Sequence, residues 1–184
     1  MKIVFLDALT MGTTPMTEIA ALGEFVCYDS STAAQARERV HDADVVILNK
    51  VIVNQEFLDA APKCRLICEA GTGINNIDVE LCNARGVKVR NVAGYSTDSV
   101  SQLTWMHILN LVGNAFYYDR KVKSGEYSLT SIHTDPTNPF EELAGKTLGV
   151  VGMGAIGTAY LQKAAALGAD CYGVRRTRHD KPDF

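Results

Sequence analysis

Residues 147–157 read Thr-Leu-Gly-Val-Val-Gly-Met-Gly-Ala-Ile-Gly, and this stretch decides the fold of the region around it. A β-rich run, Lys146–Val151, leads into three glycines spaced as GxGxxG, and an apolar helical pattern follows over Ala155–Leu167. Gly168 ends that helix, and a second β-rich run comes directly after it at Asp170–Val174. A strand, a glycine turn, a helix and a strand at this spacing predict a βαβ unit.

The three glycines have different physical roles in such a unit. Gly152 permits the tight turn, Gly154 lets a pyrophosphate approach the backbone, and Gly157 lets the helix and strand pack closely. The free amides around Ala155 and Ile156, together with the helix dipole, would hold the phosphates. A purely structural glycine-rich turn is the alternative, but the context of strand, helix and strand favours dinucleotide binding.

The residue that would bind the adenosine ribose is expected at the end of the second strand, ~20 residues after the motif. Arg175 stands there, followed by Arg176 and Arg178, where an acidic residue is typical of NAD binding. A guanidinium pairs with a 2′-phosphate and a carboxylate repels it, so these arginines favour NADP over NAD. A solvated basic stretch without a binding role is the alternative.

The first half of the chain alternates strand and helix patterns. Strands are predicted at Lys2–Leu6, Phe25–Tyr28, Val45–Leu48, Arg65–Glu69 and Val87–Arg90. The predicted N-caps of the helices between them are Thr13 or Thr14, Thr32, Asn54 and Asp78. This alternation indicates an α/β fold in which helices cover both faces of a parallel sheet.

The alternation stops after residue 97. One long helix is predicted over Asp98–Lys123, and because it is apolar nearly all round it must bury more than one face. It is either a core helix of one domain or a helix shared between two domains or two subunits. Ser124–Leu143 is polar and turn-rich, as in a connecting loop. We expect two domains, 1–97 and 98–184, the second truncated because one βαβ unit has too few strands to bury its sheet.

A second glycine-rich loop follows the fourth predicted strand and reads Glu-Ala-Gly-Thr-Gly-Ile-Asn-Asn-Ile-Asp over residues 69–78. It lies at the carboxyl end of a parallel strand, where open α/β sheets bind ligands. Gly71 and Gly73 would leave backbone amides pointing outward, which suits a small carboxylate or phosphate. Asp78 is expected to cap a helix rather than to contact a ligand.

These motifs together resemble the D-2-hydroxyacid dehydrogenase family. The stretches that carry the resemblance occur in order over nearly the whole chain: GTGINNID (71–78), VRNVAGYSTDSV (89–100) and LAGKTLGVVGMGAIG (143–157). The resemblance implies a flavodoxin-like substrate domain, a Rossmann cofactor domain inserted into it, and a homodimer. It also implies that an NAD(P) cofactor reduces a small 2-keto acid to a D-2-hydroxy acid.

The resemblance assigns roles to particular residues. The backbone amides of Thr72 and Gly73 would hold the substrate carboxylate, and Thr72 would also contact the nicotinamide end of the cofactor. Ala155 and Ile156 correspond to the amides that grip the phosphates. Arg175 replaces the usual Asp at the ribose position, which again favours NADP.

Catalytic residues are not assigned, because the family's catalytic Arg, Glu and His lie beyond residue 184. The histidines at positions 41, 107, 133 and 179 match no catalytic position; His107 is expected to pack on the long helix and the others to lie at the surface. The sequence also departs from the family pattern at Ser101-Gln102, where many members of the family have Ala-Glu. We expect residues 1–184 alone to be inactive; a non-catalytic binding or interaction module that keeps the carboxylate loop and the dimer helix is the alternative function.

Composition restricts the partners. The 184 residues are 47% hydrophobic and 21% charged, with a net charge of −3. A globular core is therefore expected, and nucleic acid or an anionic membrane is disfavoured as a partner. No stretch predicts a transmembrane helix or a signal peptide. The five cysteines include no CxxC pair and have no histidine at zinc spacing, so we expect free, mostly buried thiols, no metal site and a cytoplasmic protein.

Overall fold

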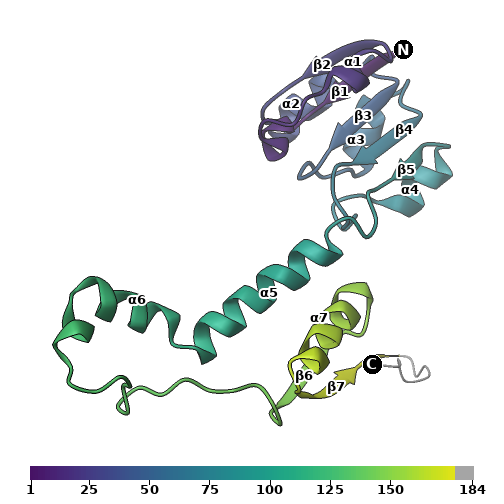
Figure 1. Cartoon of the computed structure of the whole chain (residues 1–184). Helices are drawn as coiled ribbons and strands as arrows, with labels where there is room; N and C mark the ends of the chain where they lie inside the picture. The colour runs from purple at the N-terminus through teal and green to yellow at the C-terminus, as the bar shows by residue number, and fades with distance from the viewer. Residues whose placement is uncertain (177–184) are drawn as a thin grey trace. The chain divides into compact units, whose positions relative to one another are not determined.

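The computed structural model describes residues 1–176, and contacts divide the chain into two compact units (Figure 1). Unit 1 is Met1–Tyr95 and unit 2 is Ser96–Phe184. Both combine parallel strands with helices, so the predicted α/β class is confirmed. Within the described residues, no helix is both long enough and apolar enough to cross a membrane.

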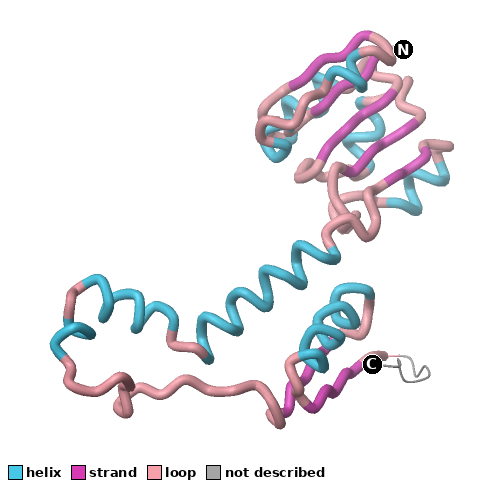
Figure 2. Tube along the Cα trace, viewed as in Figure 1, coloured by secondary structure: helices cyan, strands magenta, loops and turns pink. Residues whose placement is uncertain are grey.

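Unit 1 is built on a five-stranded parallel sheet, drawn in magenta in Figure 2. The strand order is β2-β1-β3-β4-β5, which is the flavodoxin-like order, as predicted. Each strand lies within one residue of its predicted position: β1 (Lys2–Phe5), β2 (Glu24–Cys27), β3 (Val45–Leu48), β4 (Leu66–Glu69) and β5 (Lys88–Arg90).

One face of this sheet carries the main core of unit 1. Val4 and Leu6 point to this face because side chains alternate along a strand, and both are fully buried. The helices that pack on them are α2 (Ala33–Arg39), α3 (Gln55–Ala60) and α4 (Val79–Ala84). The predicted caps of these helices are confirmed: the side chains of Thr32, Asn54 and Asp78 each accept a hydrogen bond from the backbone amide three residues on.

The opposite face is covered less fully than predicted. Among the described residues, the helices that pack there, against Ile3 and Phe5, are the short 3₁₀ helix η1 (Ala8–Met11) and α1 (Thr17–Ala20). The predicted cap at Thr13 or Thr14 is wrong: α1 begins at Thr17 with Met16 as its N-cap, because Thr13 and Thr14 belong to the turn after η1, where the amide of Thr14 donates to the carbonyl of Met11. The thin cover leaves an apolar cavity of about 720 Å³ on this face.

Unit 2 contains the predicted βαβ unit. Strands β6 (Thr147–Val151) and β7 (Asp170–Val174) pair in parallel, and α7 (Ala155–Ala166) connects them. Helix α5 (Thr97–Val112) packs on α7 through Trp105, which is only 6% exposed. This small core is all that covers the two strands within the described part of unit 2.

The single long helix predicted over 98–123 is wrong. The structure has two helices there, α5 and α6 (Ala115–Lys123), separated by Gly113 and Asn114 (Figure 1). Asn114 takes a left-handed conformation, with φ at 50°, and its side-chain amide donates to the carbonyl of Pro139 at 2.7 Å. Asparagine is one of the few residues that tolerate this conformation, so the chain turns here although the apolar pattern continues.

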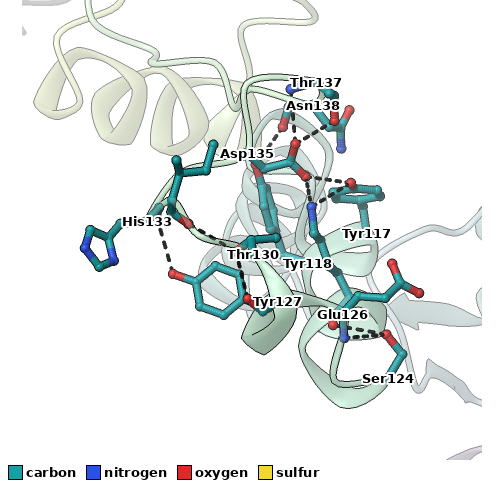
Figure 3. Close-up of polar contacts among 12 residues, drawn as sticks. Tyr117, Tyr118, Ser124, Glu126, Tyr127, Thr130, His133, Asp135, Thr137 and Asn138 are labelled. Atoms are coloured by element: carbon teal, nitrogen blue, oxygen red, sulfur yellow. Dashed lines mark hydrogen bonds and ion pairs between the residues drawn. The ribbon is translucent and has the colours of Figure 1, made fainter.

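The segment after α6 is more ordered than the predicted connecting loop. It contains the 3₁₀ helix η2 (Glu126–Leu129), and Asp135 ties it back to α6 (Figure 3). The carboxylate of Asp135 accepts hydrogen bonds from the hydroxyls of Tyr117 (2.6 Å) and Thr137 (2.5 Å) and forms an ion pair with Lys121. These partners, the Lys121 ammonium first, hold the pKa of Asp135 well below its usual range.

The five cysteines form no disulfide. Cys64 and Cys82 are buried and Cys27 is exposed, so the expectation of mostly buried thiols holds only in part. Burial raises the pKa of the Cys64 thiol to about 11, which keeps it protonated and unreactive at neutral pH.

Candidate functional site

A polar pocket of about 450 Å³ lies at the carboxyl ends of β3 and β4 in unit 1. Residues 70–73 line it, and its polar side chains are Asn49, Lys50, Glu69, Thr72, Asn75, Asn76 and Tyr95. The pocket is therefore at the edge of the sheet where ligands of open α/β folds bind, and it contains the loop predicted to hold a carboxylate.

The loop 71–76 is fixed by the chain segment after β5. The amide of Val92 donates to the carbonyl of Gly71 at 2.9 Å, and the hydroxyl of Thr72 donates to the carbonyl of Val92 at 3.1 Å. The side chain of Asn91 donates to the carbonyl of Thr72 at 2.7 Å. Thr72 and Gly73 remain exposed at the pocket, so their backbone is held firmly but stays accessible to a ligand.

Glu69, the last residue of β4, is a carboxylate that sequence reasoning did not assign to the site. It is only 2% exposed, and its Oε2 accepts a hydrogen bond from the side-chain amide of Asn76 at 3.0 Å. The same amide group donates to the carbonyl of Val51 at 3.0 Å and so ties the loop to the segment that follows β3. Burial raises the pKa of Glu69, and the nearby charge of Asp7 adds to this effect.

Asp7 is the second buried carboxylate at this edge, and it was also missed. Its side chain accepts hydrogen bonds from the backbone amides of Asn49 (2.9 Å) and Lys50 (2.5 Å). These bonds hold the turn after β3 that forms one side of the pocket. A signal existed in the sequence, since Asp7 and Glu69 each stand at the carboxyl end of an apolar strand.

The glycine motif of unit 2 has the geometry that a phosphate-binding turn needs. Gly152 has φ at +107°, which L side chains rarely adopt. A Cβ on Gly157 would lie 2.1 Å from the carbonyl oxygen of Gly152, whereas one on Gly154 would meet nothing within 4 Å. The structure thus has close packing at Gly157 and open space at Gly154, where a pyrophosphate would approach.

Helix α7 begins at Ala155, directly after this turn, and no side chain caps it. The amides of Ala155 and Ile156 lie in the first turn, where no helical carbonyl is available to accept their hydrogen bonds. These amides and the positive end of the helix dipole suit an anion. Arg175 and Arg176 follow β7 with exposed side chains, while Arg178 lies outside the described residues.

Three of the four histidines lie among the described residues. His41, His107 and His133 are exposed, so His107 does not pack within unit 2; His179 lies outside the described residues. Across residues 1–176, no three His, Cys, Asp or Glu side chains gather as a metal-ligating group.

Comparison with known proteins identifies the family of these motifs. A family model described as "D-isomer specific 2-hydroxyacid dehydrogenase, catalytic domain" matches residues 3–171. The hydroxypyruvate reductase of Blautia hydrogenotrophica is 32% identical over 173 residues, 91% of this chain and 54% of that protein. A putative 2-hydroxyacid dehydrogenase of Haemophilus influenzae is 34% identical over 169 residues, with the same coverage of 91% and 54%. The chain thus spans about half the length of these curated relatives.

Solved structures show the same fold. An acyclic imino acid reductase in complex with NADPH and D-Arg superposes with a TM-score of 0.84 at 20% identity, covering 98% of this chain and 58% of that one. The D-lactate dehydrogenase of Aquifex aeolicus, complexed with NAD and lactic acid, superposes with a TM-score of 0.81 at 22% identity, covering 97% and 52%.

Proposed function

Because the chain belongs to the D-isomer specific 2-hydroxyacid dehydrogenase family, we propose that the full-length protein reduces a 2-keto acid to the D-2-hydroxy acid with NAD(P)H. The observation that supports this proposal is that the chain combines two features suited to anions. One is the exposed loop at Thr72 and Gly73 beside the polar pocket, and the other is the glycine turn before α7, with open space at Gly154.

We assign substrate binding to unit 1. The backbone amides of Thr72 and Gly73 would bind the carboxylate of the keto acid, and the contacts of Asn91 and Val92 would keep them in position. A loop that is already fixed loses little conformational entropy when it binds a small ligand. Asp7 supports the other side of the pocket through the turn after β3.

We assign cofactor binding to unit 2. The bound nicotinamide cofactor would supply the hydride for the carbonyl carbon. The amides of Ala155 and Ile156 would hold its pyrophosphate beside Gly154, where the structure leaves space. Gly152 and Gly157 shape the turn, and Thr72 would contact the nicotinamide end. We propose NADP as the preferred form because the exposed Arg175 and Arg176 follow β7 at the ribose position.

We also propose that the full-length protein is a homodimer that uses α5 and α6. Both helices expose large apolar side chains in this structure, which favours burial against another surface. Exposed fractions range from 47% to 73% for Leu103, Met106, Leu109, Leu111, Phe116 and Val122. Light scattering that finds a monomer would contradict this part of the proposal.

The proposed reaction is tested by incubating the purified full-length protein with NADH or NADPH and a panel of keto acids. Glyoxylate, hydroxypyruvate, pyruvate and 2-ketoisocaproate differ only in the group next to the carbonyl. We expect loss of the reduced-cofactor absorbance with at least one of them. Consumption of neither cofactor with any of these acids would contradict the proposal for these substrates and favour the alternative, a binding or interaction module.

A further inference from the structure

Glu69 uses only one of its two carboxylate oxygens to hold the loop. Oε2 accepts the hydrogen bond from Asn76, whereas Oε1 has no hydrogen-bond partner among the described residues. A Cβ on Gly71 would lie 3.2 Å from Oε1, so this oxygen is directed at the loop 71–73. Oε1 is also not among the fully buried atoms that lack a partner, so it keeps some contact with solvent, and Glu69 lines both the polar pocket and the apolar cavity. It is an unused acceptor beside the proposed carboxylate site.

The surroundings of Oε1 determine which ligand groups it favours. The side chain of Glu69 is almost fully buried, so its interactions with a ligand are screened less than those of a surface carboxylate. Asp7, the other buried carboxylate nearby, adds negative charge. Lys50 also lines this pocket; its residue is exposed to solvent, and its positive charge acts on Glu69 in the opposite sense to Asp7. The buried Oε1 itself therefore favours a hydrogen-bond donor over a second anion.

We propose that Glu69 is a specificity-determining residue that accepts a hydrogen bond from a hydroxyl on the carbon next to the keto group. The same carboxylate disfavours a phosphate or a second carboxylate at that carbon. The inference rests on the function proposed above, in which the amides of Thr72 and Gly73 hold the substrate carboxylate. A site built to bond a substrate hydroxyl discriminates against an analogue that lacks it, because the acceptor is then left unpaired.

The substrate profile of the unmodified full-length protein gives the first test. Glyoxylate has no side chain and serves as the internal reference; pyruvate, hydroxypyruvate and phosphohydroxypyruvate add a methyl, a hydroxyl and a phosphate to the series. We expect kcat/KM for hydroxypyruvate to exceed that for pyruvate by at least ~10-fold, with phosphohydroxypyruvate lowest. Equal values for pyruvate and hydroxypyruvate, or a preference for phosphohydroxypyruvate, overturn the inference even if Glu69 variants do not fold.

The substitution Glu69→Gln gives the second test. Its amide oxygen can still accept from Asn76, which leaves an NH₂ donor where Oε1 was. We expect the ratio of kcat/KM for hydroxypyruvate to that for glyoxylate to fall about 10-fold, and the relative rate with phosphohydroxypyruvate to rise. Glu80→Gln, which changes an exposed carboxylate at the start of α4, should leave both ratios unchanged.

The outcomes separate the two proposals. An equal loss of kcat/KM for glyoxylate and hydroxypyruvate in Glu69→Gln means that Glu69 only holds the loop, and the specificity role is then wrong. Turnover of glyoxylate with an unexpected side-chain profile contradicts this inference alone. No turnover of glyoxylate or any other keto acid contradicts the proposed function itself, and this inference with it.

Discussion

The indole Nε1 of Trp105 donates a hydrogen bond to the backbone carbonyl of Tyr160 at 3.1 Å, and the two rings stack with their centroids 5.2 Å apart. This contact joins α5 to α7 at the centre of the small core of unit 2. Since α7 carries the glycine turn at its start, Trp105 connects the stability of unit 2 to the proposed cofactor site.

We expect Trp105→Phe to lower the free energy of unfolding of unit 2 by about 1–3 kcal/mol, because it removes the hydrogen bond and part of the packing. Trp105 is the one tryptophan of the chain, so its fluorescence reports the unfolding of unit 2 in the parent protein. The variant lacks this tryptophan, and its unfolding in urea is followed by circular dichroism instead. Tyr172→Phe, at a residue 64% exposed, is the aromatic control and should change stability by less than about 0.5 kcal/mol. Equal stability of Trp105→Phe and the parent would contradict this role.

Gly154 and Gly157 offer a matched pair of substitutions. Gly154→Ala meets open space and should fold with an unchanged Tm, but its methyl group would obstruct the pyrophosphate. We expect it to weaken NADPH binding at least ~10-fold, measured by nicotinamide fluorescence. Gly157→Ala places its Cβ against the carbonyl of Gly152 and should lower the Tm as well. Unchanged NADPH affinity in folded Gly154→Ala would mean that no phosphate approaches this turn.

Arg175 should set the preference between the two cofactors. A charge-assisted contact with the 2′-phosphate contributes about 1.5–3 kcal/mol, so kcat/KM should favour NADPH over NADH by about 10–100-fold. Arg175→Asp should reverse this ratio, and Arg120→Asp, at an exposed arginine of α6, should leave it unchanged. Equal use of both cofactors by the parent protein, or a preference for NADH, would refute the assignment.

Asp135 should stabilise the folded conformation of residues 126–138, the segment after α6. Its pKa is lowered, so its contribution to stability is present above the ordinary pKa of aspartate and is lost as pH falls through the lower, folded-state value. At neutral pH, Asp135→Asn should therefore speed amide hydrogen exchange in residues 126–138. The control Glu141→Gln breaks only an exposed ion pair with Lys146 and should have little effect. Identical exchange in Asp135→Asn and the parent would show that the ion pair does not order the segment.

Local patterns predicted most of unit 1 correctly. Val45–Leu48 is a run of apolar residues that fits a strand buried on both faces, and Thr32 has a glutamine three residues later to complete a capping box. Such signals depend on neighbours within a few positions. The break at Gly113 and Asn114 has a weaker local signal, since both residue types end helices, but the apolar pattern continues past it and the contact that holds the turn is with Pro139, 25 residues away.

The candidate site was predicted only in part for the same reason. Gly71, Gly73 and the GxGxxG turn are recognisable because their spacing itself has a backbone consequence. The roles of Asp7 and Glu69 depend on contacts that the fold creates, since Asp7 meets the backbone of residues 49 and 50, more than 40 positions later. The position of a carboxylate at the end of a strand suggests a site. Its burial and its hydrogen-bond partners follow only from the structure.

The stereochemistry of the reverse reaction tests the central claim most directly. The full-length protein is incubated with NADP⁺ or NAD⁺ and with the separate D and L enantiomers of glycerate and lactate, and formation of the reduced cofactor is recorded. We predict reduction of the cofactor with a D enantiomer and none above background with the corresponding L enantiomer. Oxidation of the L enantiomers, or no oxidation of either enantiomer while the protein is folded, would contradict the assignment as a D-2-hydroxyacid dehydrogenase.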